Sequence, residues 1–311
     1  MGYLIFSDYA PLIQDANFLQ ILSANDRIRT DSEKAAQAEA ISFLRQKYDT
    51  TFELKDLTIW DKTAPYSAYD RVYLDANAYV NNFTYNIGDL ALHNGSIYEC
   101  NTNGTTGTWS DAKWDLLGLQ YDIYYALPPF SPFILTNVYN VGDKVFYKEN
   151  VYTCLVNTPL LDHETGLQYR LQQNLPYQNV FPDDPQAGTN YWHLEESYIV
   201  PAGTDINNEA FWSATDNRDQ QMKQKFCEIT LFHLHKRIAP RNIPQLRIDA
   251  YMGAESDRSV VNGEIRYPLY SALGWLQASA RGEVTPALPL LQPKQGQRVR
   301  WGGDIKNINS Y

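Results

Sequence analysis

The histidines are the first residues to test for metal or proton-transfer chemistry, because imidazole binds metal ions and exchanges protons near neutral pH. The chain has 5 of them. His233 and His235 stand two residues apart in a predicted helix, so they point to different faces and cannot share a metal ion. His93, His163 and His193 match no zinc-site spacing. We therefore expect no metal centre, and packing or a solvated helix face for the pair.

Acidic residues form two short clusters, DHE at 162–164 and PDDP at 182–185, that resemble the paired carboxylates of general acid–base catalysis. Both lie in a polar stretch that is predicted to be a loop, where solvated turns are the expected structure. The sequence contains no glycine-rich phosphate loop, no G-x-S-x-G and no H-E-x-x-H. We therefore expect a protein that is not an enzyme and that uses no cofactor.

The charge of the chain is concentrated in its middle. The formal net charge is −10, and residues 61–197 hold 6 Lys/Arg against 16 Asp/Glu, whereas residues 198–311 hold 14 against 11. This balance argues against a sequence-specific nucleic-acid binder, which needs many phosphate contacts. No apolar run approaches the roughly 20 residues that span a bilayer. The 23 Tyr and 7 Trp suggest rings at surfaces as well as in cores.

Two similar phrases, YNIGDLALHNGSIYEC at 85–100 and YNVGDKVFYKENVYTC at 139–154, predict a duplicated β module. In the first copy Asn94-Gly95 lies between two apolar runs, which is a strong hairpin signal. In the second copy Glu149-Asn150 is expected to form that turn. Both copies close alike, so that Trp114 aligns with Trp192 and Leu116 with Leu194, and 158–188 is a loop insertion. Cys100 and Cys154 are expected to be small buried residues rather than a disulfide.

Both ends of the chain carry helical patterns. Residues 30–49 predict an amphipathic helix capped by Thr30 or Asp31, with one apolar stripe (Ala35, Ala38, Ile41, Leu44 and Tyr48). A second helix is predicted from Thr215 or Asp216 to the residue before Pro240, with one apolar stripe (Met222, Phe226, Ile229, Leu231 and Leu234). Further helices are predicted within 242–254 and 267–284, and Cys227 falls within a helix.

Together these patterns predict an α+β protein in which a discontinuous all-α domain is interrupted by two small antiparallel β modules. The expected boundaries are 1–62 and 200–292 for the helical domain, 63–126 and 127–199 for the modules, and 293–311 for an extended C-terminal arm.

The repeated pattern Tyr-x-x-Gly-Asp…Tyr-x-Cys…Trp-x-Leu resembles the small chitin-binding-type carbohydrate-binding modules of glycan-active proteins. That resemblance implies rings that stack on the apolar faces of sugars. The candidate glycan-binding residues are Trp109, Trp114, Trp192, Tyr98 and Tyr152. The alternative is that these rings form the small core of each module. Trp109 has no counterpart in the second copy, which favours an exposed role for it.

With the middle removed, the helical ends resemble the head–tail connector (adaptor, neck, head-completion) proteins of tailed bacteriophages, of the crAss-like type. The resemblance is carried by three phrases, an Ala-rich helix ending in KYD, then LFHLHKRIAP, then a helix ending in AYMGA. The closing WGGDIKNINSY is similar to the C-terminal arm of such proteins.

This second resemblance implies a closed homo-oligomeric ring, commonly of about twelve subunits. Such a ring would dock on the portal protein and on the next neck or tail protein, around double-stranded DNA that passes without sequence specificity. The arm would then pair with a neighbour through strand addition, and its candidate residues are Arg300, Trp301, Ile305, Ile308 and Tyr311. The implied location is the virion neck, with the host cytoplasm as the site of assembly and no membrane contact.

The two resemblances leave alternatives open. In a virion protein, the β modules would face outward and bind a host-surface glycan or a fibre or collar protein. The alternative hypothesis is a free carbohydrate-binding protein, or an accessory domain of a glycan-active enzyme. In that case the helical ends would serve only as a scaffold for the β modules.

Overall fold

The computed structural model describes residues 2–14, 26–51, 54–134, 137–157, 181–183, 188–288 and 290. Helices and several small sheets are both present, which confirms the predicted α+β class. The chain divides into two compact units by its contacts. One contains Met1–Leu127 and Ile199–Leu291, and the other contains Pro128–Tyr198. The predicted arm, residues 293–311, and most of the loop insertion, with His163, lie outside the described residues.

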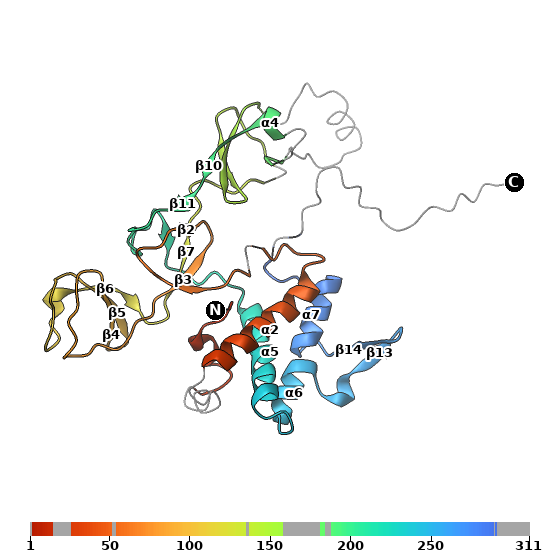
Figure 1. The fold of residues 1–311 in the computed structure, drawn as a ribbon. Helices are drawn as coiled ribbons and strands as arrows, with labels where there is room; N and C mark the ends of the chain where they lie inside the picture. Colours follow the sequence, from red (N-terminus) through yellow and green to blue (C-terminus); the bar gives the residue numbers. More distant parts are fainter. Residues whose placement is uncertain are drawn as a thin grey trace. The chain divides into compact units, whose positions relative to one another are not determined.

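Figure 1 shows the elements along the chain. The helical elements are η1 (Phe6–Tyr9), α2 (Asp26–Leu44), η2 (Asp111–Lys113), α4 (Gly188–Tyr191), α5 (Gln220–Ile238), α6 (Gln245–Met252), η3 (Glu255–Asp257) and α7 (Ala272–Arg281). The strands are β1 (Thr58–Ile59), β2 (Tyr66–Ser67), β3 (Arg71–Tyr73), β4 (Leu90–His93), β5 (Ser96–Cys100), β6 (Trp114–Leu119), β7 (Ile123–Ala126), β8 (Lys144–Tyr147), β9 (Asn150–Cys154), β10 (Trp192–Ser197), β11 (Ile199–Val200), β12 (Trp212–Ser213), β13 (Ser259–Val261) and β14 (Glu264–Arg266).

One apolar core joins helices from the two ends of the chain. Helix α2 packs against α5 and α7, and α6 packs against α5 and α7 (Figure 1). Leu44 of α2, Phe226 of α5 and Leu276 of α7 are buried members of this single core. Residues that are far apart in the sequence therefore depend on each other for burial, which is the main driving force for folding.

The stripe predicted for α5 is confirmed, because Met222, Phe226, Ile229, Leu231 and Leu234 are all buried. The cap of this helix was misplaced. The side chain that accepts a hydrogen bond at its start belongs to Asp219, from the backbone N–H of Met222, so the helix starts about one turn later than Thr215 or Asp216 suggested. An aspartate in either place satisfies a free N–H equally well, and local sequence does not distinguish them.

The apolar stripe predicted for residues 30–49 is confirmed at Leu44 and Tyr48, which are both buried in the core, and was wrong in its first half. The helix begins at Asp26 rather than after Thr30, and its buried face consists of Ser32, Glu33, Ala36, Ala40 and Leu44. Ala38, which was predicted to be buried, is exposed. Alanine is tolerated on both the buried and the exposed face of a helix. An Ala-rich pattern therefore does not show which face packs against the neighbouring helices.

A four-stranded sheet with the order β1-β3-β7-β12 was not predicted. It brings together residues 58–73, 123–126 and 212–213, and β11 pairs with β2 beside it. Its strands have two to four residues, which is too short for alternation of apolar and polar residues to be recognised. The sheet lies in the same compact unit as the helices and the first repeat.

Each repeat folds into a three-stranded antiparallel sheet, β4-β5-β6 in the first and β8-β9-β10 in the second. The predicted alignment is confirmed by the strand register, since Cys100 pairs with Trp114 and Cys154 pairs with Trp192. The turn at Asn94-Gly95 is confirmed as well, with φ values of +51° and +83°. The equivalent turn uses Lys148-Glu149, with φ of +47° and +67°, and the prediction of Glu149-Asn150 was wrong.

The hairpins of the two copies share several hydrogen bonds at an offset of 54 residues. Gly88 and Gly142 both have a φ of +92°, and each donates its N–H to the carbonyl of its cysteine, at 2.9 and 2.8 Å. Each cysteine Sγ donates to a carbonyl two residues on, at 3.1 Å in both copies. Both thiols are free and buried, as predicted. Such matched geometry supports duplication of a complete folding unit.

A glycine in α7 gives a test of the helical packing. A Cβ added at Gly274 would overlap the carbonyl oxygen of Pro268, so Gly274→Ala should destabilise the helical core by about 1–3 kcal/mol. Urea unfolding of the full chain, followed by the helical circular dichroism signal, measures this change. Without the close approach, the same substitution should stabilise the helix by about 0.5–1 kcal/mol, so a gain in stability would contradict the packing. Ala280→Gly is the reverse control in α7, with an expected loss of about 1 kcal/mol.

Candidate functional site

The aromatic rings of the first module form a closed cluster. Trp114 is buried at 4% exposure. The ring of Trp109 is stacked on His93 at 4.0 Å and on Trp114 at 4.9 Å, with interplanar angles of 10° and 14°. Its indole N–H donates to Asp111 at 2.6 Å. Stacking partners on Trp109 therefore occupy the ring surface that a sugar would need.

The second module repeats this cluster. Trp192 and Tyr152 are buried at 2% and 6% exposure, and Phe133 and Tyr139 stack as Tyr79 and Tyr85 do. The structure thus places Trp114, Trp192 and Tyr152 in cores, which is the alternative considered for these candidates. Tyr98 is half-buried, with its ring edge-on to Trp109 at 4.9 Å. Trp109 does have a structural counterpart in the second module. Trp109 stacks on His93, and buried Phe181 stacks in the same way on Tyr147, which is the equivalent of His93.

Three exposed aliphatic positions recur in the two modules, and sequence reasoning missed them as a set. Their exposed fractions match from copy to copy, at 49% and 45%, 60% and 61%, and 58% and 52%. The pairs are Val80 with Ile134, Ile87 with Val141, and Leu116 with Leu194. Other exposed positions have changed type, for example from Phe83 to Asn137. Each module therefore keeps an exposed aliphatic side chain at the same three positions.

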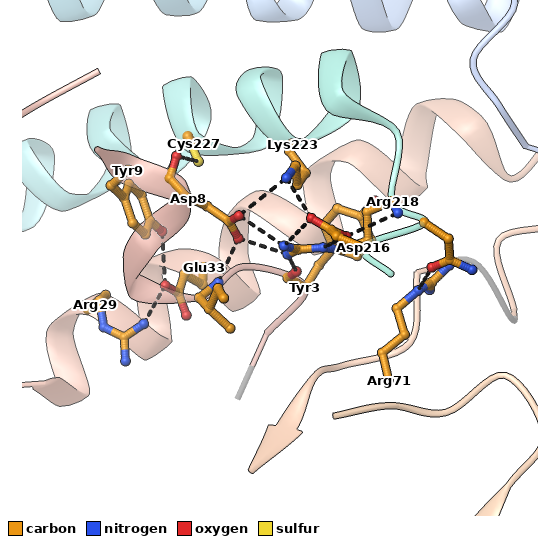
Figure 2. A network of polar contacts seen from close by, with 12 residues as sticks. Tyr3, Asp8, Tyr9, Arg29, Glu33, Arg71, Asp216, Arg218, Lys223 and Cys227 are labelled. Carbon is orange, nitrogen blue, oxygen red and sulfur yellow. Dashed lines mark hydrogen bonds and ion pairs between the residues drawn. The ribbon is translucent and has the colours of Figure 1, made fainter. Parts of the chain in front are cut away.

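A buried network of charges lies around Arg218 (Figure 2). The side chain of Arg218 is fully buried, and Asp8 is 5% exposed. The guanidinium group donates to both carboxylate oxygens of Asp8, at 2.8 and 2.9 Å, and to both oxygens of Asp216, at 2.8 and 3.0 Å. A fifth hydrogen bond goes to the carbonyl of Tyr3 at 2.8 Å. Each of the five N–H groups of the guanidinium is therefore used.

Lys223 completes the pairing, because its Nζ lies 2.7 Å from Asp216 and 3.6 Å from Asp8. Burial by itself would raise the pKa of Asp216, but hydrogen bonds from Arg218 and Lys223 and their positive charge outweigh this and hold that pKa well below its usual value. The same carboxylates raise the pKa of Arg218 despite its burial. The network contains two basic and two acidic side chains, so its formal charges balance.

A third carboxylate, Glu33 on α2, lies beside the network (Figure 2). It accepts hydrogen bonds from Arg29 at 2.8 Å and from Tyr9 at 2.9 Å. Burial, followed by the charge of Glu33, raises the pKa of Tyr9 well above its usual value. Burial also raises the pKa of the Cys227 thiol, whose Sγ contacts the carbonyl of Asp8 at 3.5 Å. A thiol and a phenol held neutral in this way are poor nucleophiles.

The network joins three distant parts of the first unit. It links the N-terminal segment to the start of α5, and Arg71 of β3 donates to Asn217 at 2.8 Å. A cavity of about 680 Å³ borders it, lined in part by Ser7, Lys223 and Gln224. Sequence reasoning missed Arg218, because its partner Asp8 is 210 residues away.

The histidines in α5 behave as predicted for packing. Nε2 of His233 lies 2.9 Å from Glu39, which also accepts from the hydroxyl of Tyr251 at 2.6 Å. Burial, followed by the charge of Arg247, lowers the pKa of His235. Within the described part of the chain, no group of three or more His, Cys, Asp or Glu could hold a metal ion. In the same residues, no helix has the length and apolar character that a bilayer crossing requires.

A comparison with protein-family models finds none that matches the chain, and a comparison with curated proteins finds no similar sequence. The geometry of the described residues therefore carries the functional argument. The described residues show three features. The buried charges around Arg218 are fully paired, the aromatic rings of the modules pack against one another, and exposed aliphatic side chains recur at matched positions.

Removing Arg218 should be strongly destabilising, because Asp8 and Asp216 would be left buried without their main partner. We expect Arg218→Met to lower the free energy of unfolding by about 3–5 kcal/mol. The control is Arg281→Met, which removes an exposed pair with Glu283 and should cost at most about 1 kcal/mol. Urea unfolding of the full chain at pH 7 measures both. Equal losses in the two variants would contradict a structural role for the network.

The low pKa of Asp216 predicts a pH dependence. A group whose pKa is lower in the folded state stabilises the fold at pH values above its unfolded pKa of about 4, and that contribution is lost as the pH falls toward the folded pKa. Asp216→Asn should therefore be less stable than the unchanged protein at pH 7, and the difference should shrink steadily below about pH 4. Unfolding curves of both proteins between pH 7 and pH 3 provide the test. A difference that is constant with pH would show that the charge of Asp216 is not responsible.

Proposed function

We propose that this chain is a structural subunit of a ring assembly, of the kind formed by the head–tail connector proteins of tailed bacteriophages. The observation that carries the proposal is the discontinuous helical core, in which α2 packs on α5 and α7 although the modules intervene in sequence. A connector-like helical domain opened to receive inserted modules would have this organisation. The portal, the next neck protein and passing double-stranded DNA are the partners that this proposal includes.

The paired charges favour a structural role over catalysis. Arg218, Asp8 and Asp216 saturate one another, so none of them is poised to bind a substrate or transfer a proton. Catalytic groups instead need a partly exposed position and a pKa matched to the reaction. A network of this kind fixes the N-terminal segment on α5 and gives a ring subunit a rigid body.

The β modules are proposed to attach another protein of the neck, collar or fibre. Their aromatic rings pack in cores or against one another, whereas aliphatic side chains such as Ile87 and Val141 are 60% and 61% exposed. Aliphatic side chains with a polar surround are suited to a protein surface, while sugar recognition relies on open ring faces. Two copies would give two-point attachment, which raises the effective affinity.

The assembly state of the full chain tests this proposal. We expect negative-stain micrographs and sedimentation velocity of the purified protein to show rings or head-to-tail oligomers, alone or with the portal protein. Deleting residues 300–311 should weaken that assembly. A protein that remains monomeric at all concentrations, with and without the portal protein, would refute a ring subunit.

A chitin pull-down tests the alternative, a carbohydrate-binding protein. We expect no retention of the full chain on chitin or peptidoglycan, because the rings of Trp114 and Trp192 are buried. Retention that is lost in Trp109→Ala but kept in Trp275→Phe, a change in the core of the helical domain, would instead favour sugar binding.

A further inference from the structure

The end of α5 carries an excess of positive charge in a chain whose formal net charge is −10. Residues 235–247, which contain the last turn of α5, the following loop and the first turn of α6, include four Lys or Arg and no Asp or Glu. Residues 27–39 of α2 hold three residues of each sign. The local excess is therefore four positive charges, opposite in sign to the net charge of the whole chain.

The first half of α2 lies beside this end of α5. Arg237 donates to the carbonyl of Asp31 at 3.2 Å, and its guanidinium group lies 3.5 Å from the Asp31 carboxylate. Arg27 lies 3.9 Å from the same carboxylate and is 87% exposed. Lys34 follows Arg27 by seven residues in α2, so the two share one helix face, and Lys34 is exposed. The cations of α2 are thereby placed next to those of residues 235–247.

The carboxylates of this region are already engaged within the fold. Glu33 and Glu39 accept the hydrogen bonds described above, and Asp31 lies between two arginines. Among the described residues, four cations have no carboxylate at ion-pair distance, namely Lys34, Lys236, Arg241 and Arg247. The described part of the chain therefore leaves their positive charge without a direct ionic partner.

Arg247 stands where a cation does not stabilise its own helix. It lies in the first turn of α6, which has no acidic residue, and the positive end of a helix dipole disfavours a cation there. Arg247 is half-buried and donates to the carbonyl of Leu12 at 3.3 Å, whereas buried Arg218 donates to five oxygen atoms. Burial lowers the pKa of Arg247, and the negative charge of Glu228 offsets this only in part. An anion bound at this surface would supply the missing compensation.

We propose that this surface, called the cationic end below, binds the phosphate backbone of a nucleic acid without reading its sequence. Its members are Arg27, Lys34, Lys236, Arg237, Arg241 and Arg247. Four of the six are arginines, whose planar guanidinium group fits pairs of phosphate oxygens. Contacts to the backbone alone are non-specific, and the acidic residues 61–197 would keep a polyanion away from the middle of the chain. This inference rests on the proposed function for the identity of the nucleic acid, double-stranded DNA, and assigns that contact to named side chains.

Neutralising two members of the cationic end tests the contact. Lys236→Gln with Arg241→Gln, made in the full chain, removes two exposed cations. Fluorescence anisotropy of a labelled random duplex of about 20 base pairs, between about 50 and 200 mM salt, measures binding. We expect the unchanged protein to bind with a dissociation constant of about 1–100 μM near physiological salt. The double variant should bind about tenfold more weakly at about 50 mM salt, and the slope of log affinity against log salt should fall in magnitude by about 2.

The matched control is Arg45→Gln with Arg266→Gln, which changes the net charge by the same amount. Arg45 follows the last residue of α2 and Arg266 ends β14, and both are exposed. Because α2 is about 28 Å long, Arg45 lies far from the α2 cations of the cationic end. This variant should bind the duplex as tightly as the unchanged protein. Circular dichroism and melting curves that match the unchanged protein confirm that both variants are folded.

The possible results distinguish this inference from the ring proposal. If both double variants weaken binding equally, or if the unchanged protein does not bind the duplex at about 50 mM salt, the cationic end is refuted while a ring still stands. If polyglutamate competes as well as unlabelled duplex of equal charge, the surface fits an acidic protein and the nucleic-acid assignment is overturned. If the protein is monomeric with and without the portal protein, but only the Lys236 and Arg241 variant loses DNA binding, the ring proposal fails and the cationic end is upheld.

Discussion

The structure of the helical part depends on the fully buried guanidinium group of Arg218. Desolvating Arg218 is costly, and the cost is offset only when both Asp8 and Asp216 are in place around it. The N-terminal segment must therefore reach the start of α5 before either is stable there. A separate hydrogen bond from Arg71 to Asn217 connects β3 of the unpredicted sheet to the residue next to Arg218.

The modules solve a different problem, which is how to fold a short β unit with a very small core. Each uses a Trp, a Tyr and a Cys inside one three-stranded sheet, and a hydroxyl group completes the backbone hydrogen bonds. Tyr85 accepts from the N–H of Val80 at 2.9 Å, and Tyr139 accepts from that of Ile134 at 2.7 Å. The aromatic rings that looked available for ligands are thereby engaged in the fold. The side chains that remain exposed at matched positions of the two modules are aliphatic.

The proposed assembly follows from this division of roles. In this proposal, paired charges and packed helices would give the subunit a rigid body, and the modules would supply repeated attachment points. The heterologous contacts of a ring need rigidity, because a subunit that flexes cannot hold one rotation around a closed ring. The buried network is therefore as relevant to assembly as to the stability of one chain.

The sequence by itself determined the features that depend on neighbours along the chain. The repeat, its Asn94-Gly95 turn and the apolar stripe of α5 follow from local periodicity and from backbone preferences of individual residues. The alignment of Trp114 with Trp192 could be inferred from the duplication, and the strand register agrees with it. The α+β class was predicted for the same reasons.

Tertiary structure decided everything that depends on partners distant in sequence. It chose which face of an alanine-rich helix is buried, moved the second hairpin turn to Lys148-Glu149, and formed a sheet from strands too short to show a period. It also converted Asp8 and Arg218, separated by 210 residues, into one buried ion pair. Charge pairing and burial are properties of spatial neighbours, and a linear pattern carries no record of which distant residues those will be.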